Sequence, residues 1–247
     1  MILLTRRALL AGGSAGAALA LSGCNTVRRP PPAVVVLEPI DPVPIAPVPV
    51  VASEDLPAGP PAARYAALYP PIDDKFPITG LRPGTIGPAF WRAEIDYPTR
   101  EEPGTVVIDP HRHYLYHVLP NGRAMRYGVG VGRDGFAWNG VSSINSKQEW
   151  PDWYPPKEMI ERQPELQRVV TKLQSGEGVA GGPHNPLGAR AMYLWQNNKD
   201  TLYRIHGTTE PSSIGKSVSS GCIRMVNQDA IHLYDRVQVG SKVVVLG

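Results

Sequence analysis

The stretch that decides the fold is Thr105-Val106-Val107-Ile108-Asp109, followed by His113-Tyr114-Leu115-Tyr116-His117-Val118. Both runs consist mainly of β-branched and aromatic residues, which favour strands. Leu119-Pro120-Asn121-Gly122 then supplies the Asn-Gly turn signal ahead of the next apolar run, at 124–131. The sequence therefore predicts a β-hairpin in this region.

Working outward, further strands are predicted where short apolar runs are separated by Gly, Pro or Asn, at 140–144, 191–195, 202–205 and 242–246. A helical pattern occurs only at 156–173, interrupted by Pro164, and at 227–237, where we expect Asn227 to cap the helix. The prediction is a mainly β domain at 104–247, with mixed sheets and a few short helices.

Composition limits the kinds of function open to the chain. Its 247 residues allow one or two domains, and the formal net charge is +3. Arg6 and Arg7 lie in a segment that we expect to be removed, which leaves 23 − 22 = +1. A balance so close to neutral argues against nucleic acid as a partner. The two cysteines, Cys24 and Cys222, stand in separate contexts, so a disulfide framework is not expected.

The N-terminus has the layout of an export signal. Residues 1–23 place Arg6 and Arg7 ahead of an uncharged apolar stretch that ends in Leu21-Ser22-Gly23-Cys24. The last four residues resemble a bacterial lipobox, which implies lipidation of Cys24 and a membrane anchor; Thr5–Leu10 also resembles a twin-arginine signal. We expect a periplasmic location, with the outer membrane favoured because Asn25 rather than Asp follows the cysteine.

Two further segments precede the domain. Residues 24–61 are rich in proline and predict a semi-rigid polyproline II tether. Residues 62–103 keep many Pro and Gly residues and add aromatics, so we expect an extended arm that packs against the domain.

Nucleophilic chemistry is suggested by Cys222 and His206. His206 ends a predicted strand, and Gly221 directly precedes the cysteine. A thiol with an ordinary pKa of about 8.5 needs an imidazolium or a helix N-terminus nearby to form a thiolate at neutral pH, and both are predicted close to Cys222. Gly221 would let backbone amides point at a developing oxyanion.

The motifs around these two residues resemble the L,D-transpeptidase (YkuD-type) catalytic domain. They are His206-Gly207-Thr208, Gly215-Lys216, Ser219-x-Gly221-Cys222-Ile223-Arg224-Met225 and, upstream, Asn185-Pro186-Leu187-Gly188. The resemblance runs from about Gly104 to the C-terminus. It implies a β-sandwich-like or barrel-like domain that remodels bacterial peptidoglycan, with Cys222 as the nucleophile and His206 as its base. Gly207 and Thr208 fall beside the base, and Asn185 falls in a motif expected near substrate.

One position departs from the family pattern. The family usually has a histidine directly before the Gly-Cys pair, where this chain has Ser220. The departure removes one candidate for substrate orientation or oxyanion support, although the hydroxyls of Ser219 and Ser220 can still donate hydrogen bonds.

The remaining candidates leave alternatives open. Arg224 can bind a substrate carboxylate or form an internal ion pair that braces its loop. Trp153 lies in a segment that resembles one near the family's substrate groove, yet aromatics beside prolines often simply pack. Histidines at 111, 113 and 117 alternate as on one strand face, but without a fourth ligand we expect no metal. We expect His184 near the cleft and a structural role for His232.

The resemblance implies a cysteine acyltransferase that needs no cofactor. Cys222 would attack the third residue of a tetrapeptide stem, release D-Ala and form a thioester. The acceptor stays open between a stem amine, an outer-membrane protein and water, the last giving an L,D-carboxypeptidase. Two other classes remain: a non-catalytic peptidoglycan-binding lipoprotein, which Ser220 keeps open, and a zinc amidase.

Overall fold

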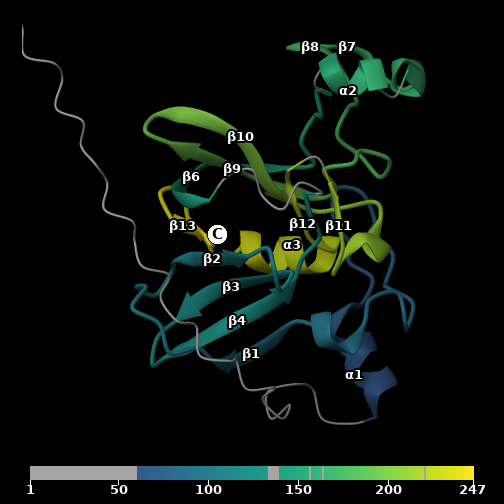
Figure 1. Ribbon diagram of the computed structural model, residues 1–247. Helices are drawn as coiled ribbons and strands as arrows, with labels where there is room; N and C mark the ends of the chain where they lie inside the picture. The colour runs from purple at the N-terminus through teal and green to yellow at the C-terminus, as the bar shows by residue number, and fades with distance from the viewer. Residues whose placement is uncertain (1–59, 133–138, 156, 163, 220) are drawn as a thin grey trace, which may run out of the picture. The chain divides into compact units, whose positions relative to one another are not determined.

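The computed structural model describes residues 60–132, 139–155, 157–162, 164–219 and 221–247 (Figure 1). The predicted signal peptide at 1–23, the lipidation site Cys24, nearly all of the tether at 24–61 and Ser220 lie outside these residues. Within the described part of the chain, no helix has the length and apolar character needed to cross a membrane.

Nine strands form one mixed sheet (Figure 1). In the order in which they pair, they are β1 (Ala93–Asp96), β4 (Arg123–Gly128), β3 (Tyr114–Leu119), β2 (Val106–Asp109), β13 (Lys242–Val245), β6 (Gly140–Glu149), β9 (Arg190–Gln196), β10 (Lys199–His206) and β12 (Ile223–Arg224). Strand β13 runs parallel to β2 and β12 runs parallel to β10, whereas the other pairs are antiparallel. The predicted mainly β class with mixed sheets is confirmed.

The smaller elements complete the described residues. Two further pairs of strands are β5 (Val131–Gly132) with β11 (Ser217–Ser219), and β7 (Thr171–Leu173) with β8 (Gly176–Gly178). The helices are α1 (Pro61–Leu68), α2 (Lys157–Arg162) and α3 (Asn227–Tyr234), with 3-10 turns η1 (Pro88–Phe90), η2 (Pro164–Arg168) and η3 (Pro211–Ser213).

The predicted hairpin is formed by β3 and β4. Asn121 and Gly122 have φ of 61° and 70°, the left-handed values that a tight hairpin turn requires. The turn sets the register at Leu119 opposite Arg123. Strand β2 is buried along its whole length because β3 and β13 flank it and both of its faces are covered.

The main core lies between the sheet and α3. Ala230 and Leu233 of α3, with Val237 just after it, belong to one apolar cluster with fully buried side chains of the strands, among them Ile108, Leu115, Leu194, Ile205 and Ile223. In Figure 1 the yellow α3 lies across the inner side of the sheet, beside β2 and β12. The helix therefore ties the two ends of the sheet together and places its N-terminus close to β12.

Two helix predictions need correction. The region predicted as helical at 156–173 contains α2 and η2, with Pro164 at the start of η2 as the predicted interruption, but its last residues form the extended strand β7. The predicted helix at 227–237 is present as α3. Asn227 is its first residue and not its cap, and its side-chain oxygen accepts a hydrogen bond from the distant Ala189 N–H.

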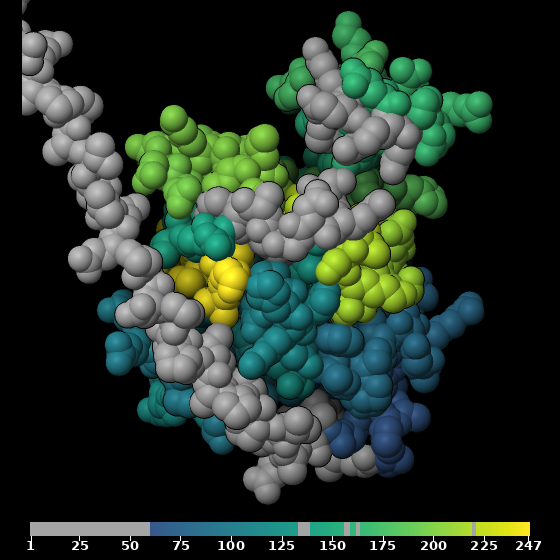
Figure 2. Space-filling view, viewed as in Figure 1, coloured from purple at the N-terminus to yellow at the C-terminus, as the bar shows by residue number. Residues whose placement is uncertain are grey.

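The arm at 62–103 is folded against the sheet. Tyr65, Leu68 and Trp91 pack with Ile214 and Val226 in a second apolar cluster, and β1 adds an edge strand beside β4. Figure 2 shows the blue surface of the arm adjoining the yellow-green surface around residue 210. An extended conformation was expected throughout, but 61–68 form α1, which begins at a proline and buries Tyr65 and Leu68.

Polar contacts also hold the arm. Arg92 forms a 2.8 Å ion pair with the buried carboxylate of Asp229 on α3, and it donates to the Leu68 carbonyl. Next to Asp229, the Gln228 amide donates to the carbonyls of Pro70 and Thr79. The start of α3 is thus fixed to the arm on one side and to the strands on the other.

Candidate active site

Parallel pairing of β10 with β12 brings the two predicted catalytic residues onto neighbouring strands. Ile205 lies opposite Ile223, and His206 lies opposite Arg224. Extending this register back by one residue places Cys222 beside Arg204. With strands about 4.8 Å apart and a rise of about 3.3 Å per residue, the Cα atoms of Cys222 and His206 are then about 8 Å apart.

Side-chain alternation separates the site from the core. Ile205 and Ile223 are fully buried in the main core. Residues one position away point to the opposite face, so His206 and Arg224 share a face with Arg204 and Cys222. The pairing thus gathers a thiol, an imidazole and two guanidinium groups on one side of the sheet.

His206 is held as one tautomer by its backbone neighbour. Its Nδ1 lies 2.5 Å from the carbonyl oxygen of Gly207, and because a carbonyl can only accept, Nδ1 carries the proton. Nε2 of the neutral ring is then the atom able to accept a proton. Burial lowers the pKa of His206 to about 4, and the charges of Arg224 and Arg204 act in the same direction. At neutral pH the ring is an uncharged base.

Cys222 is held as a neutral thiol. Burial raises the pKa of its thiol, and a backbone hydrogen bond of Arg204 together with the charges of Arg204 and Arg224 opposes this rise. The sequence predicted a thiolate stabilised by imidazolium or by a helix N-terminus. Burial disfavours the charged form of both groups, and β12 separates the cysteine from α3, so the preformed thiolate stays a prediction that these surroundings do not favour.

Gly221 is required where it stands. Its φ of 121° is strained for any residue with a side chain, and a Cβ there would lie 2.9 Å from a ring carbon of Tyr203. The chain entering Cys222 therefore lies directly against the Tyr203 ring. Ser219 ends β11, its side chain is not among those described, and Ser220 lies outside the described residues.

Arg224 forms the internal ion pair that the sequence left as one of two alternatives. Its guanidinium lies 2.9 Å from the carboxylate of Glu210, which is mostly exposed to solvent. Its backbone is bonded in both directions to Gly130. A substrate carboxylate would have to displace Glu210 to reach this guanidinium.

Arg204 is a site residue that sequence reasoning missed. It binds the Asp200 carboxylate through two hydrogen bonds of 2.8 Å, and its guanidinium stacks 4.6 Å from the centre of the Tyr193 ring. The sequence does indicate its position, because Arg204 lies two residues before His206 in the predicted strand and therefore points to the same face. The bulge in β10 between Asp200 and Arg204, which sets their spacing, was not visible in the sequence.

Asn227 positions the backbone next to the base and is a second residue that the sequence analysis did not single out for the site. Its Oδ1 accepts the Ala189 N–H at 3.0 Å. A Cβ at Gly188 or Gly207 would come within 2.2 or 2.1 Å of that oxygen. Both glycines are therefore needed for the loop at 185–188 and the end of β10 to meet at the first residue of α3.

Asn185 and Trp153 have structural roles in the described residues. The buried Asn185 donates to the carbonyls of Pro151, Val179 and Ala180 and accepts the Leu187 N–H, so its amide is fully used in shaping its loop. The substrate-binding role expected for Asn185 stays a prediction. Trp153 is half-buried, and its backbone pairs with Val179, which closes the segment between them that contains β7 and β8.

The other histidines do not form one strand face. His111 and His113 lie in the turn before β3, and only His117 is within that strand, where it is buried. His232 pairs with the Tyr127 hydroxyl at 2.8 Å, a structural contact, and His184 is exposed in its loop. Across the described residues, no group of three or more His, Cys, Asp or Glu side chains is placed to hold a metal ion.

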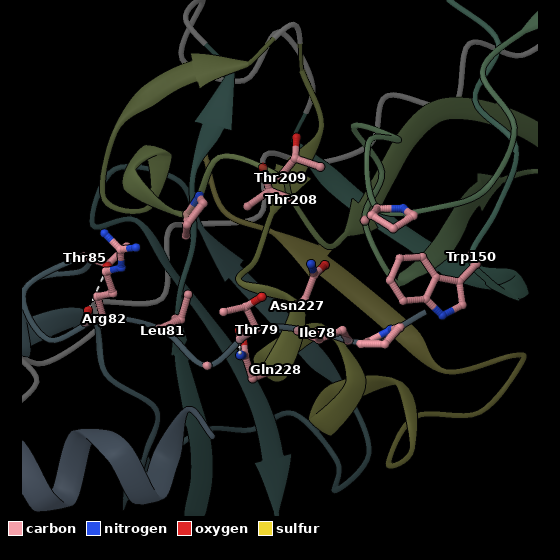
Figure 3. Close-up of a pocket in the computed structure, with 15 residues that line it drawn as sticks. Ile78, Thr79, Leu81, Arg82, Thr85, Trp150, Thr208, Thr209, Asn227 and Gln228 are labelled. Atoms are coloured by element: carbon pink, nitrogen blue, oxygen red, sulfur yellow. Dashed lines mark hydrogen bonds between the residues drawn. The ribbon is translucent and has the colours of Figure 1, made fainter. Parts of the chain in front are cut away.

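A cavity of about 370 Å³ lies next to the loop that follows β10 (Figure 3). Thr208, two residues after His206, lines it with Asn227 of α3 and Trp150. Thr208 is buried, and its hydroxyl oxygen accepts the Glu210 N–H at 3.0 Å. The facing wall comes from the arm, at 77–82 and Thr85.

Comparisons with known proteins agree with these observations. A family model described as the YkuD L,D-transpeptidase catalytic domain matches residues 103–245. The probable L,D-transpeptidase ErfK/SrfK of Escherichia coli K12 is 34% identical over 57% of this chain and 43% of its own length. The putative L,D-transpeptidase YqjB of Bacillus subtilis is 33% identical over 57% of this chain and 69% of its own. The chain spans 43% and 36% of the two ErfK/SrfK relatives, from Escherichia coli and Salmonella typhimurium.

Solved structures also match this chain. A crystal structure from Brucella melitensis, described as a probable carnitine operon oxidoreductase, is 50% identical over 66% of this chain and 97% of that chain, with a TM-score of 0.44. An L,D-transpeptidase from Mycobacterium smegmatis is 18% identical over 58% of each chain, with a TM-score of 0.42.

Proposed function

Because the chain belongs to the YkuD family of L,D-transpeptidase catalytic domains, we propose that it is a peptidoglycan L,D-transpeptidase with Cys222 as nucleophile and His206 as base. The observation that supports the proposal is the parallel pairing of β10 with β12, in which the half-buried Cys222 and His206, whose Nδ1 already holds its proton, belong to neighbouring strands. The site has the nucleophile, base and orienting acceptor that covalent catalysis requires.

In the first half-reaction, the thiol proton passes to Nε2 of His206 as the sulfur attacks the carbonyl of the third, L-centred stem residue. The bond between that carbonyl and D-Ala then breaks, the amine of D-Ala leaves with the proton from His206, and a thioester on Cys222 remains. The Gly207 carbonyl stabilises the imidazolium formed between these steps.

In the second half-reaction, an acceptor amine attacks the thioester and gives a proton to Nε2 of His206. The carbon–sulfur bond breaks, and the departing sulfur takes that proton back. This restores the neutral pair that burial favours. We propose the side-chain amine of a second stem as the main acceptor, an outer-membrane protein as another, and water as a side reaction.

Intact mass measurement tests the first half-reaction. Incubation with a disaccharide-tetrapeptide or a carbapenem is expected to leave an acyl group on Cys222, and Cys222→Ser is expected to remain unmodified. Dimeric products with loss of D-Ala indicate cross-linking, and tripeptides alone indicate a carboxypeptidase. Binding of the stem peptide without an adduct on Cys222 and without any product would support the alternative of a non-catalytic peptidoglycan-binding lipoprotein. Activity that is lost with EDTA would indicate a zinc amidase.

We also propose that Cys24 carries the lipid anchor of an exported, periplasmic protein, because Leu21-Ser22-Gly23-Cys24 follows an apolar stretch. Labelling cells with a clickable fatty acid tests this. The wild type is expected to take up label and to fractionate with the outer membrane, and Cys24→Ala is expected to do neither. Label that persists on Cys24→Ala would exclude the lipobox interpretation.

A further inference from the structure

The cavity next to Thr208 has one wall that the family match does not include. The wall formed by 77–82 and Thr85 precedes residue 103, where the family model begins. The opposite wall comes from the catalytic domain and includes Thr208, Asn227 and Trp150. Figure 3 shows Thr79 and Leu81 on one side of the cavity and Thr208 and Thr209 on the other. The arm therefore completes a binding space that the catalytic domain alone would leave open.

The cavity is anchored in place. Gln228, at its floor, donates to the carbonyls of Pro70 and Thr79, which fixes the arm wall to α3. Ile78 on the arm packs with Trp150 and Ala189 in a separate apolar cluster. The volume of about 370 Å³ lies within the range of roughly 300–1,000 Å³ usual for small-molecule sites. A space of this size held by both walls is suited to one compact chemical unit.

The lining mixes apolar surfaces with neutral polar groups. The apolar surfaces come from Pro77, Ile78, Leu81, Trp150, Pro183 and Pro211. Hydroxyl and amide groups come from Thr79, Thr208, Thr209 and Asn227. Thr208 accepts the Glu210 N–H, so its hydroxyl proton stays available to donate, and Asn227 accepts the Ala189 N–H through Oδ1, which fixes the orientation of its amide.

The small number of charged side chains in the lining favours a neutral ligand. Of the described residues that line the cavity, Arg82 alone carries a charged side chain, and it is exposed. A neutral ligand that presents C–H faces to the rings and hydroxyl or amide groups to the threonines and Asn227 fits this lining. A pyranose with an acetamido group has these features, whereas the carboxylates of a stem peptide call for paired cationic partners.

The cavity also lies close enough to the reacting pair for one substrate to contact both. Thr208 follows His206 by two residues, so at about 3.3 Å per residue the Cα atoms of the base and of this lining residue are no more than about 7 Å apart. In a peptidoglycan donor, about three stem residues separate the attacked carbonyl from the sugar and span about 10 Å when extended, so one substrate can reach from the reacting pair to this loop.

We infer that this cavity binds the N-acetylated amino sugar to which the donor stem peptide is attached. The inference rests on the proposed function, because it names the part of the substrate that lies beyond the reacting carbonyl. Binding the sugar here would hold the stem with its third residue at Cys222. Substrates that carry glycan would then be preferred over free stem peptides.

Binding to the full chain of the stem-free disaccharide N-acetylglucosaminyl-N-acetylmuramic acid, with its lactyl carboxyl capped as a methylamide to keep it neutral, tests the site without any turnover. Calorimetry or NMR titration is expected to show saturable binding that Thr79→Trp and, from the other wall, Thr209→Trp each weaken at least tenfold by filling the cavity. Thr99→Trp, an exposed threonine outside the cavity, is the matched control and is expected to bind as wild type. Absent binding, or equal binding by all four proteins, would overturn the inference.

Turnover supplies the second measurement. Thr79→Trp is expected to lower kcat/KM for the disaccharide-tetrapeptide about tenfold, mainly through KM, and to leave kcat/KM for the free tetrapeptide unchanged. If the free tetrapeptide loses as much, and Arg82→Gln reproduces the loss, the cavity binds a stem carboxylate and the sugar assignment is wrong. If neither substrate ever acylates Cys222, the proposed function fails, while the disaccharide titration still reports on the cavity.

Discussion

The carbonyl oxygen of Gly207 lies 2.5 Å from Nδ1 of His206, and this contact decides which nitrogen of the ring can act as a base. A carbonyl has no proton to give, so Nδ1–H must donate and Nε2 must hold the lone pair. The backbone thereby orients the ring in the way that a third side chain does in other nucleophilic sites.

The first prediction concerns the pH dependence of acylation by a carbapenem. Burial lowers the pKa of His206 to about 4, so the base form is already complete well below neutral pH and is lost only as the pH falls through about 4. The second-order acylation rate is expected to be flat from pH 7 to about 5 and to fall about tenfold per pH unit below 4. Circular dichroism in the same buffers controls for acid unfolding. A midpoint near 6.5 would show an ordinary, solvated histidine.

The second prediction concerns the reactivity of Cys222 without substrate. Because burial raises the pKa of the thiol, its alkylation by iodoacetamide is expected to keep rising above pH 8.5 with no plateau near neutral pH. Arg204→Gln removes a charge that favours the thiolate and is expected to shift the profile to still higher pH. Arg100→Gln, an exposed residue on the arm, is the control. A reactive plateau at pH 6 would restore the preformed thiolate–imidazolium pair.

The third prediction concerns the ion pair of Arg224 with Glu210. The glutamate is mostly exposed, so we expect a coupling of only about 0.2–1 kcal/mol in a double-mutant cycle of Arg224→Gln and Glu210→Gln, measured by urea unfolding. Glu210→Gln should leave kcat/KM for stem substrates within about twofold of wild type. If it instead lowers KM severalfold, the freed guanidinium is binding a substrate carboxylate.

The fourth prediction concerns the buried ion pair of Arg92 with Asp229. Burial raises the pKa of Asp229 to about 6, and the charge of Arg92 opposes that rise. Without Arg92 the folded-state pKa rises further, so the protonated form stabilises the fold at low pH and this stabilisation is lost as the pH rises through 6 and above. Arg92→Met is expected to cost about 3–5 kcal/mol at pH 8 and much less at pH 5.

Denaturant unfolding at both pH values measures the effect of Arg92→Met. In an Asp229→Asn background the cost of Arg92→Met is expected to become independent of pH, because no carboxylate is left to titrate. A cost that is equal at pH 5 and pH 8 in the wild-type background would show that Asp229 is not the group responsible.

Local patterns explain why much of the fold could be predicted from sequence. The β2–β3–β4 region follows from its β-branched runs and from Asn121-Gly122, because these residues restrict their own backbone whatever surrounds them. The pairing of Cys222 with His206 was suggested by motif order, and the register of β10 with β12 shows how the fold brings them near each other.

Other features were decided only by tertiary structure, because they depend on neighbours far away in sequence. Burial disfavours the charged forms of Cys222 and His206, and no local sequence pattern shows this. The sequence predicts Asn227 as a helix cap. In the fold, its Oδ1 instead accepts the Ala189 N–H and lies against Gly188 and Gly207. In sequence, the arm at 62–103 is a segment rich in proline and glycine. Only its packing in the folded chain makes residues 77–82 and Thr85 a wall of the cavity. Sequence thus determined the strands and the reacting groups, and tertiary packing determined their charge and surroundings, since desolvation and steric fit are properties of the assembled chain.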